Sequence, residues 1–237
     1  MTAYTPHLAP LVTLLFLAVL FLAGLGLLAM VLGAVRRAPL LAGVAAAATG
    51  MVAGGYFFLV VGVSAISRDQ VLPPGSLKYF CELDCHLAYS LVGSYETAAL
   101  GPELKQTAAQ GQFVVVEIKT WFDERTISPH RGDGPLTPNG RSVFLVDSAG
   151  RRFAVSREGE QALAPSGVLP LTESLRPGES YITELVFDVP PEARGLRLLL
   201  TEDSPETRFV IGHENSFLHR KIYLGLGPDP HSSTSFR

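Results

Sequence analysis

The stretch QFVVVEIKTWF, from Gln112 to Phe122, decides the fold of the polar part of this chain. Valine, isoleucine and aromatic residues dominate it, and Gly111 and Asp123 bound it, which is typical of a β-strand. Similar runs lie on both sides, and turn signals such as PNG, SAG, RPGES and PPEARG separate several of them. The predicted strands are residues 77–83, 85–96, 112–122, 141–147, 151–155, 181–189, 195–202 and 218–226.

About eight short strands without a strong amphipathic helix predict an antiparallel β-sandwich over residues 77–226. The run VDSAGRRF, residues 146–153, predicts a tight hairpin inside it. We expect one helical exception, a turn or two within residues 97–110. Residues 227–237 are polar and are expected to form a flexible tail.

Two long apolar blocks precede the sandwich, at about residues 8–35 and 39–66. Each exceeds the roughly 20 apolar residues that a helix needs to cross a bilayer. The first block lacks the basic start of a signal peptide and is longer than its apolar core. Residues 1–68 are therefore predicted to form a transmembrane helical hairpin, and residues 69–76 a Pro/Gly linker.

The charges near the helices predict an orientation. Arg36 and Arg37 lie between the two apolar blocks, whereas no lysine or arginine precedes the first one. Positive charge in short loops stays in the cytoplasm. We therefore expect a protein of the bacterial inner membrane, with its N-terminus and its C-terminal domain on the periplasmic or extracytoplasmic side.

The second apolar block contains the GxxxG pattern Gly50–Gly54 among other small residues. Such a surface allows a second helix to approach closely. It either packs against the first helix of the same hairpin or contacts another membrane protein or a second copy of this chain.

Composition and motifs exclude several functions. The 237 residues carry a formal net charge of −3, so no basic field indicates binding to nucleic acid. No nucleophile elbow of the G-x-S-x-G type is present. We expect a protein without enzymatic activity.

Residues 111–202 contain a Val-rich strand, the LVDSAGRRF hairpin from Leu145, the LRPGES turn from Leu175 and the LVFDVP pair from Leu185. In these features they resemble a bacterial family of immunoglobulin-like sandwiches. That family is related to extracellular immunoprotective lipoproteins. The resemblance implies an immunoglobulin-like, exported domain that binds or scaffolds other molecules. This chain departs from that family by having two membrane helices where a lipid anchor is usual.

The order of the parts also resembles cytochrome oxidase subunit II, where two membrane helices precede an exported β-sandwich. That subunit holds copper in a C-x3-C-x3-H loop near the end of the sandwich. Here Cys81 and Cys85 lie at the beginning of the sandwich, and His86 follows Cys85 directly.

The segment CELDCH from Cys81 to His86 has four possible interpretations. A disulfide between the two cysteines suits an oxidising exterior, although it requires a tight turn between them. C-x3-C-H resembles the attachment motif of haem c. The two cysteines and His86 could instead hold copper or zinc, joined by His213 and His219. The fourth reading is a pair of free thiols.

Two loops are the candidate contact surfaces. The first, residues 125–140, is long and rich in Pro and Gly, and it includes His130, Arg131 and Asp133. The second is residues 212–221, which include Asn215. The predicted function is that of a membrane-anchored, extracytoplasmic binding or scaffolding domain, an accessory subunit of a membrane complex. The alternative is a redox or metal carrier built on the cysteine segment.

Overall fold

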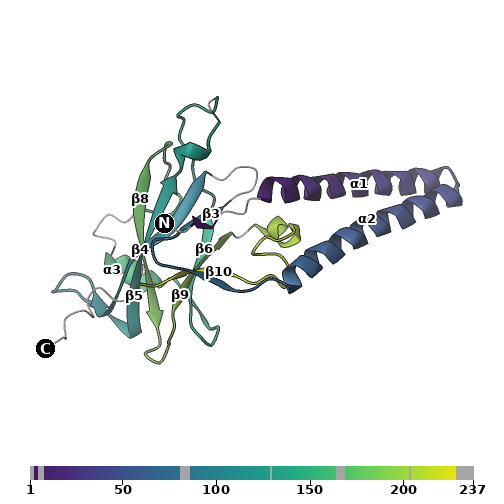
Figure 1. Ribbon diagram of the computed structural model, residues 1–237. Coiled ribbons are helices and arrows are strands. Elements are labelled where there is room, and N and C mark those ends of the chain that lie inside the picture. Colours follow the sequence, from purple (N-terminus) through teal and green to yellow (C-terminus); the bar gives the residue numbers. More distant parts are fainter. Residues whose placement is uncertain are drawn as a thin grey trace. The chain divides into compact units, whose positions relative to one another are not determined.

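The computed structural model describes residues 3–4, 8–80, 86–128, 130–163, 169–202 and 204–227 (Figure 1). The α-helices are α1 (Ala9–Val35), α2 (Pro39–Ala65) and α3 (Arg157–Leu163), with 3-10 turns η1 (Glu124–Thr126) and η3 (Pro205–Phe209). The strands are β1 (Ala3–Tyr4), β2 (Gln70–Leu72), β3 (Leu77–Phe80), β4 (Leu87–Leu100), β5 (Thr107–Phe122), β6 (Arg141–Val146), β7 (Arg152–Ala154), β8 (Ser180–Val189), β9 (Arg197–Glu202) and β10 (Ile222–Gly225).

Helices α1 and α2 form a hairpin whose limits agree closely with the apolar blocks of the sequence. Each helix has a proline in its first turn, where the missing N–H leaves no hydrogen bond unmade. The helices approach at Gly33, where a Cβ atom would lie 2.8 Å from the backbone nitrogen of Ala42, and at Gly26, which faces Thr49. Small residues of α1 therefore make the close contacts.

The polar part of the chain is a β-sandwich of two five-stranded sheets. The first sheet has the order β1-β3-β4-β5-β8 and the second β2-β10-β9-β6-β7. Most pairs are antiparallel, as predicted, whereas β1 with β3 and β2 with β10 are parallel. Residues predicted as a linker thus contribute β2 to the second sheet.

Strand β5 is buried on both faces. Val114, Val116 and Ile118 pack into the core between the sheets, with leucines of β6 and β9. Phe113 and Val115 point to the opposite face, where they pack with Val186 and with the apolar side of α3. A strand covered on both faces needs a continuous apolar run instead of alternation, which explains the sequence FVVV.

One helix prediction in the polar part was wrong, and one helix was not predicted. Residues 97–110 are not helical: β4 continues to Leu100, β5 begins at Thr107, and the two strands pair there, with a register shift between Thr97 and Ala99. Pairing within this long hairpin outweighs the modest helix propensity of its alanines. The helix is instead α3, whose start is marked by Ser156, because the Ser156 hydroxyl accepts a hydrogen bond from the Gly159 N–H at 3.2 Å.

The chain divides into two compact units. Met1–Pro6, Asp69–Asp203 and Ile222–Arg237 form one unit, which contains the sandwich. His7–Arg68 and Ser204–Lys221 form the other. Residues 204–221, which the sequence analysis places in the sandwich, therefore group with the helical hairpin.

Candidate functional site

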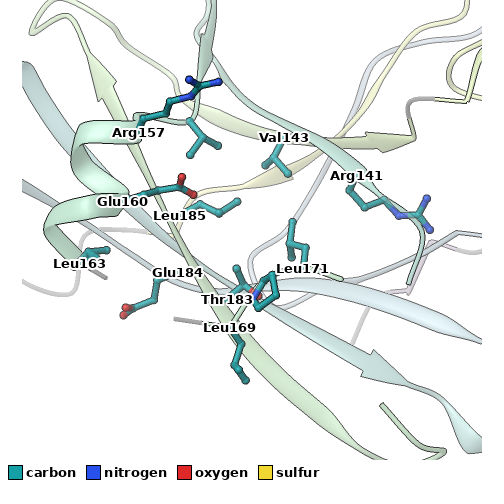
Figure 2. Close-up of a pocket in the computed structure, with 12 residues that line it drawn as sticks. Arg141, Val143, Arg157, Glu160, Leu163, Leu169, Leu171, Thr183, Glu184 and Leu185 are labelled. Atoms are coloured by element: carbon teal, nitrogen blue, oxygen red, sulfur yellow. The ribbon is translucent and has the colours of Figure 1, made fainter. Parts of the chain in front are cut away.

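A cavity of about 600 Å³ lies at the edge of the sandwich, between β8 of one sheet and β6 of the other (Figure 2). Helix α3 and residues 169–171 complete its wall. Its volume falls in the range of ligand pockets, roughly 300–1,000 Å³. The lining residues are Arg141, Val143, Val155, Arg157, Glu160, Leu163, Leu169, Pro170, Leu171, Thr183, Glu184 and Leu185.

The wall of this cavity is mostly apolar. Figure 2 shows Val143, Leu171 and Leu185 turned toward the cavity, whereas the carboxylate of Glu184 points away from it. Glu160 extends from α3 toward the cavity, and Arg157 of the same helix also lines it. A cavity of this kind suits an apolar group of a ligand or partner, with polar groups at its margin.

Several buried polar atoms of the sandwich lack a hydrogen-bond partner within the described part of the chain, and two of them belong to residues that line this cavity, Thr183 and Arg141. The Thr183 hydroxyl and Nε of Arg141 have no hydrogen-bond partner among the described residues, and the same holds for the hydroxyls of Tyr89 and Thr120. Tyr89 and Thr120 face each other across β4 and β5. Burial raises the pKa of Tyr89, so its hydroxyl stays protonated and able to donate. Of these residues, Thr183 and Arg141 line the cavity and can offer hydrogen bonds to a polar group in it.

A buried ion pair stands beside these atoms. Nη1 of Arg141 lies 3.1 Å from Oε1 of Glu202, and their side chains are only 4% and 2% exposed. The guanidinium group also lies 4.2 Å from the centre of the Phe80 ring. Lys78 is buried too, and its ammonium group donates to the carbonyls of Leu200 at 2.6 Å and Ile222 at 3.0 Å. Charge buried in this way is costly unless it is paired, as it is here.

The sequence analysis did not single out Arg141, Thr183 or Glu202. The sequence pattern could have indicated that Arg141 is buried, because alternation along β6 places it on the same side as Val143 and Leu145, which are in the core. Alternation along β9 does the same for Glu202. What the sequence could not supply is that these two residues pair directly across the β6–β9 ladder.

The cysteines lie outside the described residues, so the disulfide, haem and metal readings of Cys81 and Cys85 stay predictions. His86 is described and is nearly buried. Its Nδ1 lies 2.8 Å from the Thr126 hydroxyl, and its ring stacks on Phe122 at 5.7 Å. These contacts fix the ring at the start of β4.

The histidines expected to join a metal site lie in the other unit. The Nδ1 atom of His213 accepts from the N–H of Asn215 at 3.1 Å, and Nδ1 of His219 lies 2.7 Å from the carbonyl of Arg220. Burial lowers the pKa of His219. Among the described residues, no three side chains of His, Cys, Asp or Glu gather to form a metal site.

The predicted contact residues of the 125–140 loop differ in burial and contacts. Arg131 packs over the Phe122 ring at 4.9 Å and donates to the carbonyl of Gly134 at 2.7 Å, so part of the 125–140 loop is held against the sandwich. His130 and Asp133 are exposed in it.

In α2, a Cβ atom at Gly50 or Gly54 would meet nothing within 4 Å. The GxxxG surface is therefore not the one that packs on α1.

Comparisons with known proteins find the fold class alone. No profile of a known protein family matches the chain, and no curated protein is similar to it. The solved structures similar to it include the secreted protein MPT63 from Mycobacterium tuberculosis, at 12% identity and a TM-score of 0.42, covering 67% of this chain and 98% of that one. An uncharacterized β-sandwich protein from Clostridium difficile gives 10% identity, a TM-score of 0.38 and coverage of 68% and 96%.

A conserved hypothetical protein from Bacillus anthracis is 16% identical, with a TM-score of 0.38, and covers 49% of this chain and 81% of its own. Likeness at this level does not indicate a shared activity.

Proposed function

We propose that this protein is a membrane-anchored, extracytoplasmic binding domain without enzymatic activity. Helices α1 and α2 cross the bacterial inner membrane, with the N-terminus and the sandwich outside. The sandwich binds a protein partner as an accessory subunit of a membrane complex. The immunoglobulin-like resemblance of residues 111–202 agrees with such a role.

The exposed apolar surface of the helices carries this proposal. Both helices are long and apolar enough to cross a membrane. In the most apolar stretch of α1 no residue is buried, and in that of α2 only 11% are. A contiguous apolar surface of this extent is rare on water-soluble proteins. The bilayer covers it in the arrangement we propose.

The binding role rests on the cavity between β6 and β8. Its apolar wall suits an apolar side chain of the partner, and the hydroxyl of Thr183 is available to a polar group beside that side chain. The open GxxxG surface of α2 offers the same partner a second contact inside the membrane.

The orientation is tested by cysteine labelling in a Cys81→Ser, Cys85→Ser background. Glu103→Cys, in the exposed β4–β5 connection, should react with a membrane-impermeant maleimide added to spheroplasts. Ala38→Cys, beside the two arginines, should react only after the membrane is permeabilised. The reverse pattern would overturn the orientation, and release of the unlabelled chain into the soluble fraction would overturn the anchoring.

The binding role is tested by photo-crosslinking in native membranes. A photoreactive residue at Leu169, on the rim of the cavity and 40% exposed, should form a protein adduct. Val143→Phe, which fills the cavity, should abolish that adduct while leaving the β-sheet circular dichroism signal unchanged. The matched control is a photoreactive residue at Leu104, which is fully exposed and does not line the cavity. Equal adducts at both positions, or none at Leu169, would contradict the proposal.

A further inference from the structure

Residues 204–221 pack against α2 along the helix side. The Tyr56 hydroxyl donates to the carbonyl of Phe209 at 2.8 Å, and the Phe57 ring meets the Phe217 ring edge-on at 6.4 Å. The rings of Phe209 and Phe217 are 5.4 Å apart. At the end of α2, the Ser67 hydroxyl accepts from the N–H of Arg220 at 2.9 Å. The segment is thus attached to α2 at several points.

The contacts of Tyr56 and Phe57 lie at a defined depth along the helix. At 1.5 Å per residue, Tyr56 is about 26 Å from Pro39, which follows the arginines of the hairpin loop. Since a hydrocarbon core is about 30 Å thick, Tyr56 reaches the outer boundary of the membrane when the arginines stand at the inner one. Aromatic side chains gather at this boundary in membrane proteins.

The backbone of the segment makes its own hydrogen bonds. The N–H groups donate to carbonyls three residues earlier in successive turns, which join Thr207 to Ser204, Val210 to Thr207, His213 to Val210, Ser216 to His213 and His219 to Ser216. The Ser216 hydroxyl also bonds to the carbonyl of Val210. Internal pairing is what a non-helical segment needs near lipid, where water does not satisfy the backbone.

Large apolar side chains of the segment are exposed. Phe209 is 44% exposed, Phe217 40% and Leu218 71%. Leu218 has a φ of 65°, in the left-handed region, which is uncommon for a bulky residue. Leu218 therefore adopts a strained backbone conformation although its side chain gains little burial within the protein.

We propose that residues 204–221 form an interfacial membrane element. Phe209, Phe217 and Leu218 enter the outer boundary of the bilayer next to α2, between the lipid headgroups and the first part of the acyl chains. The occupant of this surface is lipid, because Phe57 and Phe58 of α2, which are 52% and 75% exposed, lie at the same depth and need the same cover. This inference rests on the proposed crossing of the membrane by α1 and α2.

The test uses the full chain in phosphatidylcholine vesicles and tryptophan quenching by brominated lipids. Trp121, the one tryptophan of the chain, is first changed to phenylalanine. Single reporters are then introduced as Leu218→Trp and Phe217→Trp. Leu218→Trp is the safer variant, because its side chain is mostly exposed. Phe21→Trp, near the middle of α1 and 67% exposed, is the reference for the membrane centre.

Both segment reporters should lose most of their emission to lipids brominated near the headgroup and less to lipids brominated near the chain end. Phe21→Trp should show the opposite order. If Phe21→Trp is quenched and neither segment reporter is, the interfacial element is overturned while the membrane anchor stands. If no reporter is quenched, the anchor fails and the interfacial element fails with it.

Discussion

Asp123 joins several parts of the sandwich through one carboxylate. It is 2% exposed, and it accepts hydrogen bonds from the Tyr79 hydroxyl at 2.7 Å and from Nε of Arg125 at 2.9 Å. It also accepts from the N–H of Arg125 at 3.0 Å, which caps η1. The bonds from Arg125, joined by that from Tyr79, lower the pKa of Asp123 to about 2. Strand β3 is thereby tied to the end of β5.

Replacing this carboxylate should destabilise the sandwich. Asp123→Asn weakens the charged hydrogen bonds and should lower the free energy of unfolding by about 1–3 kcal/mol at pH 7. Because the pKa of Asp123 is lowered, its contribution is present above the unfolded pKa near 4 and is lost as the pH falls toward 2. Urea unfolding in detergent at pH 7, 4 and 2.5 measures this. Asp133→Asn, in an exposed loop, is the control. A stability difference that stayed constant down to pH 2.5 would contradict the assignment.

The buried pair of Arg141 and Glu202 leads to a second prediction at this scale. Arg141→Met and Glu202→Gln should each lower the free energy of unfolding by about 3–5 kcal/mol, because each breaks a buried ion pair. The double variant should cost less than the sum of the two, which a double-mutant cycle measures. Additive losses would mean that the two groups do not interact.

The glycines of the two helices differ in how closely the other helix approaches them. Gly33 faces the backbone of Ala42, whereas Gly54 has open space beside it. The hairpin therefore depends on small residues of α1 and leaves the GxxxG surface of α2 free.

The pair of glycines allows a matched comparison. Gly33→Leu should separate the helices and lower the melting temperature of the hairpin in detergent, measured by helical circular dichroism. Gly54→Leu should leave that temperature unchanged, since its side chain meets nothing in the hairpin. In native membranes, Gly54→Leu should instead reduce the crosslinking of α2 to a neighbouring helix. A lower melting temperature for Gly54→Leu would place this surface inside the hairpin.

The two units of the molecule are interleaved in sequence. Residues 204–221 belong with the helices, although they connect two adjacent strands, β9 and β10, of one sheet. Strand β10 then pairs in parallel with β2, the strand that follows α2. The chain therefore leaves the second sheet after β9, forms residues 204–221, and rejoins the same sheet at β10.

This arrangement predicts how a soluble fragment behaves. A chain of residues 69–237 exposes Phe209 and Phe217 without α2 beside them, and we expect it to aggregate in buffer without detergent. Replacing residues 204–221 by a short Gly-Ser linker should yield a monomer with the same β-sheet signal. Size-exclusion chromatography with light scattering distinguishes the two. A monomeric fragment with residues 204–221 intact would show that α2 is not needed to cover them.

The positions of α1, α2 and most strands could be predicted from the sequence because their causes are local. Two long apolar blocks predict α1 and α2, and β-branched runs predict β5, β6 and β8. The turn SAG predicts the hairpin of β6 and β7, where Gly150 has a φ of 82°. Helix α3 escaped prediction because seven residues are too few for clear periodicity.

The sequence by itself thus determined an apolar helical hairpin followed by a β-sandwich, since hydropathy and turn chemistry act between near neighbours in the chain. Only the tertiary structure decided that β2 joins β10, that Arg141 meets Glu202, and that residues 204–221 pack on α2. Each of these contacts joins residues far apart in sequence. Such contacts form because the sheets and helices must cover one another's apolar faces and pair their buried polar groups, and no local pattern encodes that choice.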